Sequence, residues 1–170
     1  MEITLEQLLA SRDDRHEMQQ KLLRESRMQT LVCLTVIMPG RVKRNELSIF
    51  VADVAVEALY ESELYTPGNN LITRDLETGY EAYLLTPLPQ MEAKRIACGI
   101  EESHPLGRLF DLDIIGKSGI PVSREAIGLP PRQCLLCERE SRYCMRNHSH
   151  TQEEIHTRIQ QMIETYKANV

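Results

Sequence analysis

Two aspartates separated by one residue are the part of this sequence with the clearest chemical potential. Asp111 and Asp113 alternate with the apolar residues Phe110, Leu112 and Ile114. Side chains at positions i and i+2 of a β-strand point to the same face, so the two carboxylates would stand side by side. Neighbouring carboxylates repel each other, and a divalent cation relieves that repulsion. The spacing therefore predicts a metal site, for which Mg²⁺ is the natural ion because it binds one or two carboxylates together with substrate phosphates.

A magnesium site of this kind indicates phosphoryl or nucleotidyl transfer, in which the metal neutralises phosphate charge. Arg108 lies just upstream and could clamp a phosphate through two guanidinium nitrogens. The alternative is a strand whose aspartates simply face solvent. Two other phosphate motifs are excluded: Ile115 does not fit the haloacid-dehalogenase-type phosphatase pattern, and the chain has no Gly-x4-Gly-Lys-Ser/Thr P-loop.

A second cluster of reactive side chains follows in Cys134, Cys137 and Cys144, with His148 and His150 beyond them. Three cysteines and one histidine can complete a tetrahedral Zn²⁺ site, and the spacing leaves either histidine as the fourth ligand. Four protein ligands leave no open position, so such a zinc ion would be structural. The alternative is three reduced thiols in an ordinary loop. Disulfides are not expected, because the five cysteines are an odd number and no export signal is visible.

Other polar residues allow two interpretations each. His104, next to Pro105, could be a general base, although a lone histidine is more often a capping or packing residue. The stretch 12–15, Arg-Asp-Asp-Arg, indicates a solvated helix face with local ion pairs. Four arginines make the Cys-rich segment locally basic, so that it could line a polyphosphate site or form a solvated loop: Arg132, Arg139, Arg142 and Arg146.

The bulk composition is that of a soluble globular protein, with 42% hydrophobic and 26% charged residues among 170. We expect one transferase domain over 1–170, with 130–150 as a Cys-rich segment. The net charge of -5 argues against a nucleic-acid partner, which would call for a basic face. No apolar run is long enough for a membrane span, and the first residues lack the features of a signal peptide, so we expect a cytoplasmic protein without membrane contact.

The elements that must position these residues follow from apolar periodicity and capping patterns. Helices are predicted over 4–26, 46–62, 90–101 and from 151 onward, and the first would bury one stripe of leucines: Leu5, Leu8, Leu9, Leu22 and Leu23. Strands are predicted over 31–38, 70–76, 80–86 and 109–115, the second and third as a hairpin, with 121–126 as a hairpin partner of the last. This order predicts an α+β fold with a small mixed or antiparallel sheet and helices packed on one face. A nucleotidyltransferase-like arrangement is compatible with it.

Two blocks are long enough to be specific: Ser103–Asp113, which contains His-Pro-Leu-Gly-Arg, and Leu129–Cys137, which contains the first two cysteines. Shorter matches add to them: Ser11–Arg15 with Gln19, Pro39-Gly40 with Lys43, and Cys144 with Arg146 and His150. Over about residues 5–155 the sequence thus resembles the CitX family. These proteins are the apo-citrate lyase phosphoribosyl-dephospho-CoA transferases, also called citrate lyase holo-acyl-carrier-protein synthases.

The resemblance implies a transferase that uses 2′-(5″-triphosphoribosyl)-3′-dephospho-CoA. It would attach the phosphoribosyl-dephospho-CoA prosthetic group to a serine of the citrate lyase acyl carrier (gamma) subunit and release pyrophosphate. The product is a phosphodiester, so the chemistry is nucleotidyl-type transfer. Two alternatives stay open: a non-catalytic, zinc-stabilised interaction module, and the equivalent transferase for the malonate decarboxylase carrier.

The resemblance also implies roles for individual residues. Asp111 and Asp113 would hold Mg²⁺, and Arg108 would act with them by binding the triphosphate. His150, rather than His148, would complete the zinc ligands. The substrate-binding roles would fall on Arg12, Lys43, His104, Gly107 and Arg132. One departure from the wider nucleotidyltransferase superfamily is the lack of a Gly-Ser pair upstream of the first aspartate, where the stretch 104–107 stands instead.

Overall fold

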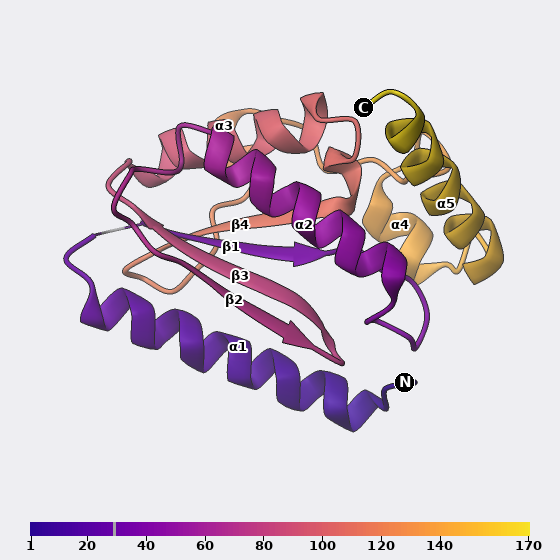
Figure 1. Ribbon diagram of the computed structural model, residues 1–170, viewed down its shortest axis with the longest axis horizontal. Helices are drawn as coiled ribbons and strands as arrows, with labels where there is room; N and C mark the ends of the chain where they lie inside the picture. Colours follow the sequence, from indigo (N-terminus) through magenta and orange to yellow (C-terminus); the bar gives the residue numbers. More distant parts are fainter. Residues whose placement is uncertain (29) are drawn as a thin grey trace.

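The structure is a computed structural model that describes residues 1–28 and 30–170. Its centre is a four-stranded antiparallel sheet in the order β2-β3-β1-β4, with helices on both sides (Figure 1). The strands are β1 (Thr30–Val36), β2 (Leu71–Leu76), β3 (Gly79–Thr86) and β4 (Phe110–Gly116). The helices are α1 (Leu5–Glu25), α2 (Glu46–Glu61), α3 (Gln90–Ser103), α4 (Ser141–Arg146) and α5 (Gln152–Ala168), with short 3₁₀ turns η1 (Gly107–Leu109) and η2 (Glu125–Ile127). The predicted α+β class is confirmed.

Helices cover both faces of the sheet, so the prediction that they cover only one face is wrong. On one face, α2, α3 and α5 pack on the main core, to which β4 contributes Phe110, Leu112 and Ile114. On the other face, α1 packs through Leu23 on a smaller core (Figure 1). The reason is visible in β1, whose residues 31–34 are buried on both sides, because a strand that is apolar on both faces needs cover on both.

The predicted leucine stripe of α1 is only partly correct. Leu23 is buried and Leu22 is half-buried, but Leu5 and Leu9 are 71% and 49% exposed. Polar residues occupy the inward positions in the middle of the helix, among them Arg15 and Gln19, so α1 presents a polar surface to the sheet there. The capping box predicted for Thr4 and Gln7 is present.

The edge of the sheet at β4 is protected by side chains rather than by the predicted partner strand at 121–126. That prediction is wrong: only Pro121 makes an isolated bridge, with Ile115, because proline has no N–H to continue a ladder. The backbone N–H of Leu112 donates to Glu101 Oε1 at 2.8 Å, and Lys94 Nζ donates to the Leu112 carbonyl at 3.4 Å. Exposed edges invite pairing with other chains, and these contacts from α3 prevent it.

The helix starts predicted at Asn45 and Thr151 are confirmed, each by a side-chain cap on the third residue of its helix. Within the described residues, no helix is long and apolar enough to cross a membrane.

Candidate active site and metal centre

The two aspartates lie together on the face of β4 that is turned towards α1. In the antiparallel register Asp113 is opposite Cys33 and Asp111 is opposite Thr35, both on β1. Their neighbours in the strand enter the main core on the other face, as the alternation predicted. Asp111 is exposed and Asp113 is half-buried, so the pair is open on one side.

The electrostatics of Asp113 fit a cation site. Burial raises the pKa of Asp113, and the neighbouring Asp111 raises it further. Lys94 and Arg15 act in the opposite direction, so positive charge at this position favours the ionised form. A divalent ion between the carboxylates would have the same effect. Two carboxylates suffice for Mg²⁺ when substrate phosphates supply further oxygens.

Glu81 of β3 is a site residue that the sequence did not reveal. It lies on the same face as the aspartates, across β1, where it pairs in register with Thr35. Its side chain is 3% exposed and accepts hydrogen bonds from Arg15 Nε at 3.0 Å and from the Tyr83 hydroxyl at 2.5 Å. A single charge in an otherwise apolar strand was the only local signal for it.

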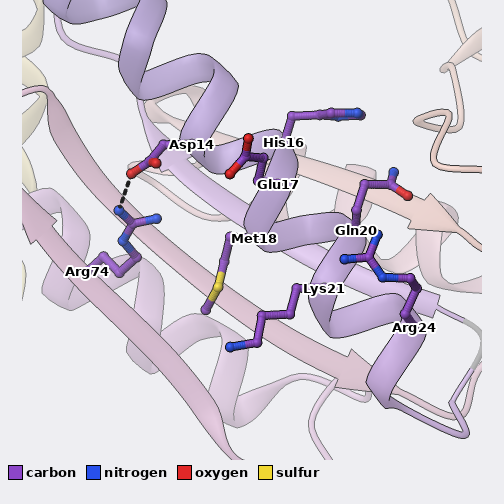
Figure 2. A pocket seen from close by; sticks show the side chains of 8 residues that line it. All are labelled: Asp14, His16, Glu17, Met18, Gln20, Lys21, Arg24 and Arg74. Carbon is purple, nitrogen blue, oxygen red and sulfur yellow. Dashed lines mark hydrogen bonds and ion pairs between the residues drawn. The ribbon is translucent and has the colours of Figure 1, made fainter.

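Arg74 of β2 completes the contacts of Glu81 and joins the sheet to α1. Its Nη1 lies 3.6 Å from Glu81, and its Nη2 donates to Asp14 at 2.9 Å. Figure 2 shows Arg74 reaching up to Asp14 at the side of a surface groove of about 460 Å³ along α1. The interpretation of residues 12–15 as a solvated helix face is therefore wrong for Arg15, which is half-buried against Glu81, and correct for Asp14, which stays exposed although its partner Arg74 is on a distant strand.

The structure brings Arg12 and Lys43 together, although 31 positions separate them in the sequence. Lys43 is half-buried and donates from Nζ to the Met38 carbonyl at 2.6 Å. Burial lowers the pKa of Lys43, and the charge of Arg12 lowers it further, so the two cations lie within electrostatic reach. Met38 follows two residues after β1 ends, at the end of the sheet where Asp111 lies. Lys43 is thus held near that end of the sheet, with Arg12 within electrostatic reach of it.

Arg108 and Arg132 form a different group at the open edge of β4. Arg132 Nη2 donates to the Phe110 carbonyl at 2.7 Å and pairs with Glu101 at 2.8 Å. Arg108 Nη2 donates to the carbonyls of Gln133 and Cys134 at 2.5 and 3.3 Å. Both line a cavity of about 320 Å³. Burial lowers the pKa of Arg108, followed by the charges of Arg132 and Arg124, and its Nε is buried without a hydrogen-bond partner in the described structure.

His104 is not brought to the aspartates. It caps α3, and its Nδ1 accepts a hydrogen bond from the Leu106 N–H at 3.0 Å. Its ring packs on Phe110 and Tyr166, with centroids 5.0 and 5.6 Å away, on the core side of the sheet. Burial lowers the pKa of His104, which favours the neutral ring. These contacts give it a packing and capping role.

Gly107 is buried in the turn between α3 and β4, also away from the aspartates. Its N–H donates to the His104 carbonyl at 2.8 Å. A methyl group on its α-carbon would lie 2.6 Å from the Glu101 carbonyl oxygen, which is closer than side chains tolerate. Glycine is therefore needed for the close approach of this turn to the end of α3.

Replacing Gly107 with Ala is expected to lower the free energy of unfolding by about 2 kcal/mol, because the methyl group would force the turn off α3. Chemical denaturation of the purified variant measures this. Gly99→Ala is the matched control, since nothing lies within 4 Å of the added methyl group and alanine is the better helix former. It should be neutral or stabilising. Equal effects of the two changes would contradict the steric explanation.

The cysteine cluster is assembled as a four-ligand site. The ligand atoms of Cys134, Cys137, Cys144 and His150 all lie within 4.8 Å of one another. Cys137 Sγ is 3.5 Å from Cys144 Sγ and 3.4 Å from His150 Nε2. Tetrahedral zinc with bonds of about 2.3 Å to sulfur holds its sulfur ligands about 3.8 Å apart, so these spacings fit the ion. His148 is exposed and outside the cluster, with φ at 46°.

A tight hairpin and the short helix α4, which the sequence did not predict, hold the four ligands. The Cys134 N–H donates to the Arg139 carbonyl at 2.7 Å, and this turn carries Cys137. Cys144 comes from α4 and is buried, and His150 lies six positions further along the chain, just before α5. Burial acts to raise the pKa of Cys134, but hydrogen bonds from the backbone N–H groups of Leu136 and Cys137, together with those from the Cys144 and Cys137 thiols, lower it overall. Such amides stabilise a thiolate, the form that binds metals.

Comparison with known proteins adds independent findings. Residues 3–166 match the model of the family described as CitX, apo-citrate lyase phosphoribosyl-dephospho-CoA transferase. Protein CitXG of Haemophilus influenzae is 39% identical over 168 residues, which cover 96% of this chain and 36% of that longer protein. A probable apo-citrate lyase phosphoribosyl-dephospho-CoA transferase of Vibrio cholerae is 36% identical over 98% of this chain and 94% of its own length. One from Streptococcus pyogenes is 32% identical, with coverage of 96% and 87%.

Proposed function

The chain belongs to the CitX family of apo-citrate lyase phosphoribosyl-dephospho-CoA transferases, and we propose that it performs this transfer at the Asp111–Asp113 face of β4. Its activity is the transfer of phosphoribosyl-dephospho-CoA to apo-citrate lyase. The observation that carries the choice of site is the juxtaposition of two carboxylates, one of them half-buried, on an edge strand flanked by cations.

The proposed donor is 2′-(5″-triphosphoribosyl)-3′-dephospho-CoA, and the acceptor is a serine of the acyl carrier (gamma) subunit. The serine oxygen forms a bond to the α phosphorus of the donor. The bond from that phosphorus to the oxygen shared with the β phosphate breaks, and pyrophosphate leaves with the electron pair. The hydroxyl proton passes to water. One phosphodiester is formed for one phosphoanhydride bond broken, which defines nucleotidyl-type transfer.

Asp111 and Asp113 are the residues proposed to hold Mg²⁺. The raised pKa of Asp113 beside Asp111 supports this, since a shared cation would offset both burial and repulsion. When bound, Mg²⁺ would neutralise charge on the phosphate oxygens. The protein's own contribution is a pair of carboxylates on one face of a strand that is paired with β1 on one edge and held by side chains of α3 and by Arg132 on the other.

Two groups of cations are proposed to bind the substrate's phosphates. Arg12 and Lys43 lie near the end of β1, and Lys43 is already partly deprived of solvent, which strengthens its attraction for an anion. Arg108 and Arg132 line the edge cavity, where their positive charges would attract an anionic group. His104 and Gly107 act through the turn that leads into β4, and so influence substrate binding indirectly.

The cysteine cluster is proposed to hold a structural Zn²⁺ ion through Cys134, Cys137, Cys144 and His150. The sulfur and nitrogen spacings support it, as do the amides directed at Cys134. All five cysteines are free thiols, which fits a reducing compartment, and we propose a cytoplasmic location. The acidic net charge supports partners other than nucleic acid.

The two other functions considered are less well supported. A non-catalytic zinc module would leave the paired aspartates without a purpose. A transferase for the malonate decarboxylase carrier would share the chemistry, but the family description and the Vibrio and Streptococcus relatives name apo-citrate lyase.

Mass spectrometry of the carrier subunit tests the proposal directly. The protein is incubated with Mg²⁺, the triphosphoribosyl donor and the apo acyl carrier subunit of citrate lyase. We expect one phosphoribosyl-dephospho-CoA group to be added to a single serine, with one pyrophosphate released. A parallel incubation with the malonate decarboxylase carrier should leave that carrier unmodified. Modification of the second carrier in place of the first would contradict the proposed acceptor.

A further inference from the structure

In the part of the chain that the structure describes, Arg15 forms an ion pair through one nitrogen only and keeps part of its side chain exposed to solvent. It projects from the inward face of α1 over the middle of the sheet, and its side chain is 25% exposed. Within the described residues its only hydrogen bond runs from Nε to Glu81 Oε1 at 3.0 Å. The two terminal nitrogens, Nη1 and Nη2, have no protein partner there. Both are donors, so the guanidinium is anchored at its inner end and open at its outer end.

Glu81 is itself held in place from several sides. Its second oxygen accepts from the Tyr83 hydroxyl at 2.5 Å and lies 3.6 Å from Arg74, which is tied to Asp14 of α1 at 2.9 Å (Figure 2). The carboxylate is almost completely buried, and each of its two oxygens has a partner. An arginine anchored to such a group is pre-organised, because its orientation does not have to be acquired when a ligand binds.

Arg15 is anchored on the same face of the sheet as the paired aspartates. Glu81, to which its Nε is bonded, pairs in register with Thr35 of β1, and Thr35 pairs on its other side with Asp111 of β4. Residues directly opposite each other in neighbouring strands share a face, so Glu81 and Asp111 lie in one row across the sheet with one strand between them. The guanidinium of Arg15 is therefore held on this face, two strands from Asp111.

We propose that Arg15 is a phosphate-binding residue of the active site, and that Glu81 is the positioning residue that orients it. Its terminal nitrogens would donate to a phosphate oxygen of the donor beside Asp111 and Asp113. The proposed role of Arg15 rests on the proposed function. It adds a phosphate-binding group from α1 to a site whose own strand, β4, is not preceded by a phosphate-binding turn. A guanidinium in this place stabilises the charge that grows on the phosphate oxygens during transfer.

Four variants test the assignment: Arg15→Ala, Arg15→Lys, Glu81→Gln and, as the matched control, Arg24→Ala. Arg24 is an exposed arginine of the same helix, near its last turn. Arg15→Ala should lower kcat/KM for transfer by about 100-fold or more, and Arg15→Lys by a smaller factor, because lysine keeps the charge but cannot fork between Glu81 and a phosphate. Glu81→Gln should mainly raise KM, and Arg24→Ala should match the wild type.

Chemical rescue and product binding separate this role from a structural one. Added guanidinium ion at millimolar concentration should restore part of the rate of Arg15→Ala, which a merely structural residue would not show. Calorimetry with pyrophosphate and Mg²⁺, without any acceptor, should show binding to the wild type and a weakening of at least about tenfold in Arg15→Ala. Circular dichroism checks the fold, and if Arg15→Ala is unfolded, Arg15→Lys decides the question by the same two measurements.

The outcomes distinguish this inference from the proposed function. A folded Arg15→Ala with wild-type kcat/KM and wild-type pyrophosphate affinity would overturn the role of Arg15 alone. An inactive wild type that binds pyrophosphate through Arg15 would contradict the proposed transfer, while the phosphate-binding role would stand.

Discussion

Asp111→Asn and Asp113→Asn are each expected to lower the rate of prosthetic-group transfer by about 10³-fold, with the fold intact. Asparagine keeps the shape of the side chain but removes the charge that a divalent ion requires. The two carboxylates repel each other on a partly buried surface, so removing one charge does not weaken the packing. The initial rate with labelled donor, Mg²⁺ and apo carrier subunit measures the effect, and thermal unfolding checks the fold.

Asp53→Asn serves as the matched control, because Asp53 is exposed on α2, which covers the opposite face of the sheet. It should transfer at the wild-type rate. If either variant of the pair on β4 kept full activity, or if Asp53→Asn lost as much, β4 would not be the catalytic strand.

Loss of the proposed zinc ion from the cysteine cluster is expected to have the second large effect. Cys137→Ser, or chelation, should lower the free energy of unfolding by about 3 kcal/mol or more, since a structural zinc site contributes its binding energy to folding. Cys137 is the residue that contacts both Cys144 and His150, so its replacement removes the centre of the cluster. Elemental analysis should find one zinc per wild-type chain, and thermal unfolding with and without chelator measures the stability.

Loss of zinc is also expected to lower the rate of transfer at the proposed active site. Arg108 donates to the carbonyls of Gln133 and Cys134, and Arg132 from this segment closes the edge of β4 at Phe110. Unfolding of the segment would uncover the strand that carries the aspartates, so transfer should fall together with stability. Replacing the ligand His150 with Ala should have the same effects as Cys137→Ser. His148→Ala is its control and should have none, because His148 lies outside the cluster. A zinc-free chain of unchanged stability would refute the structural role.

The local features of this chain could be read from its sequence because their physical causes are local. The capping boxes at Thr4 and Thr151 join residues three positions apart, and the structure contains both. Strand alternation put Asp111 and Asp113 on one face, and the apolar residues between them do enter the core. The short spacing of the cysteines predicted a common site, although spacing alone could not choose between the two histidines.

The failures of prediction lie where distant segments meet. The sequence did not reveal that His104 and Gly107 pack the end of α3 against β4, while their assignment to substrate binding stays a prediction. The packing of α1 on the second face of the sheet was not predicted, and two leucines of the predicted buried stripe of α1 are exposed. Neither fact follows from residue types, because each depends on which surfaces the tertiary fold presses together.

The carboxylate pair on β4 was thus determined by the sequence itself, through the two-residue period of a strand. What surrounds it was decided only by the tertiary structure. Arg15 and Glu81 are 66 positions apart, and each by itself is an ordinary charge on a helix or strand. Only the packing of α1 on the sheet brings them together, because burial of the Glu81 carboxylate calls for a charged partner and Arg15 is within reach of it.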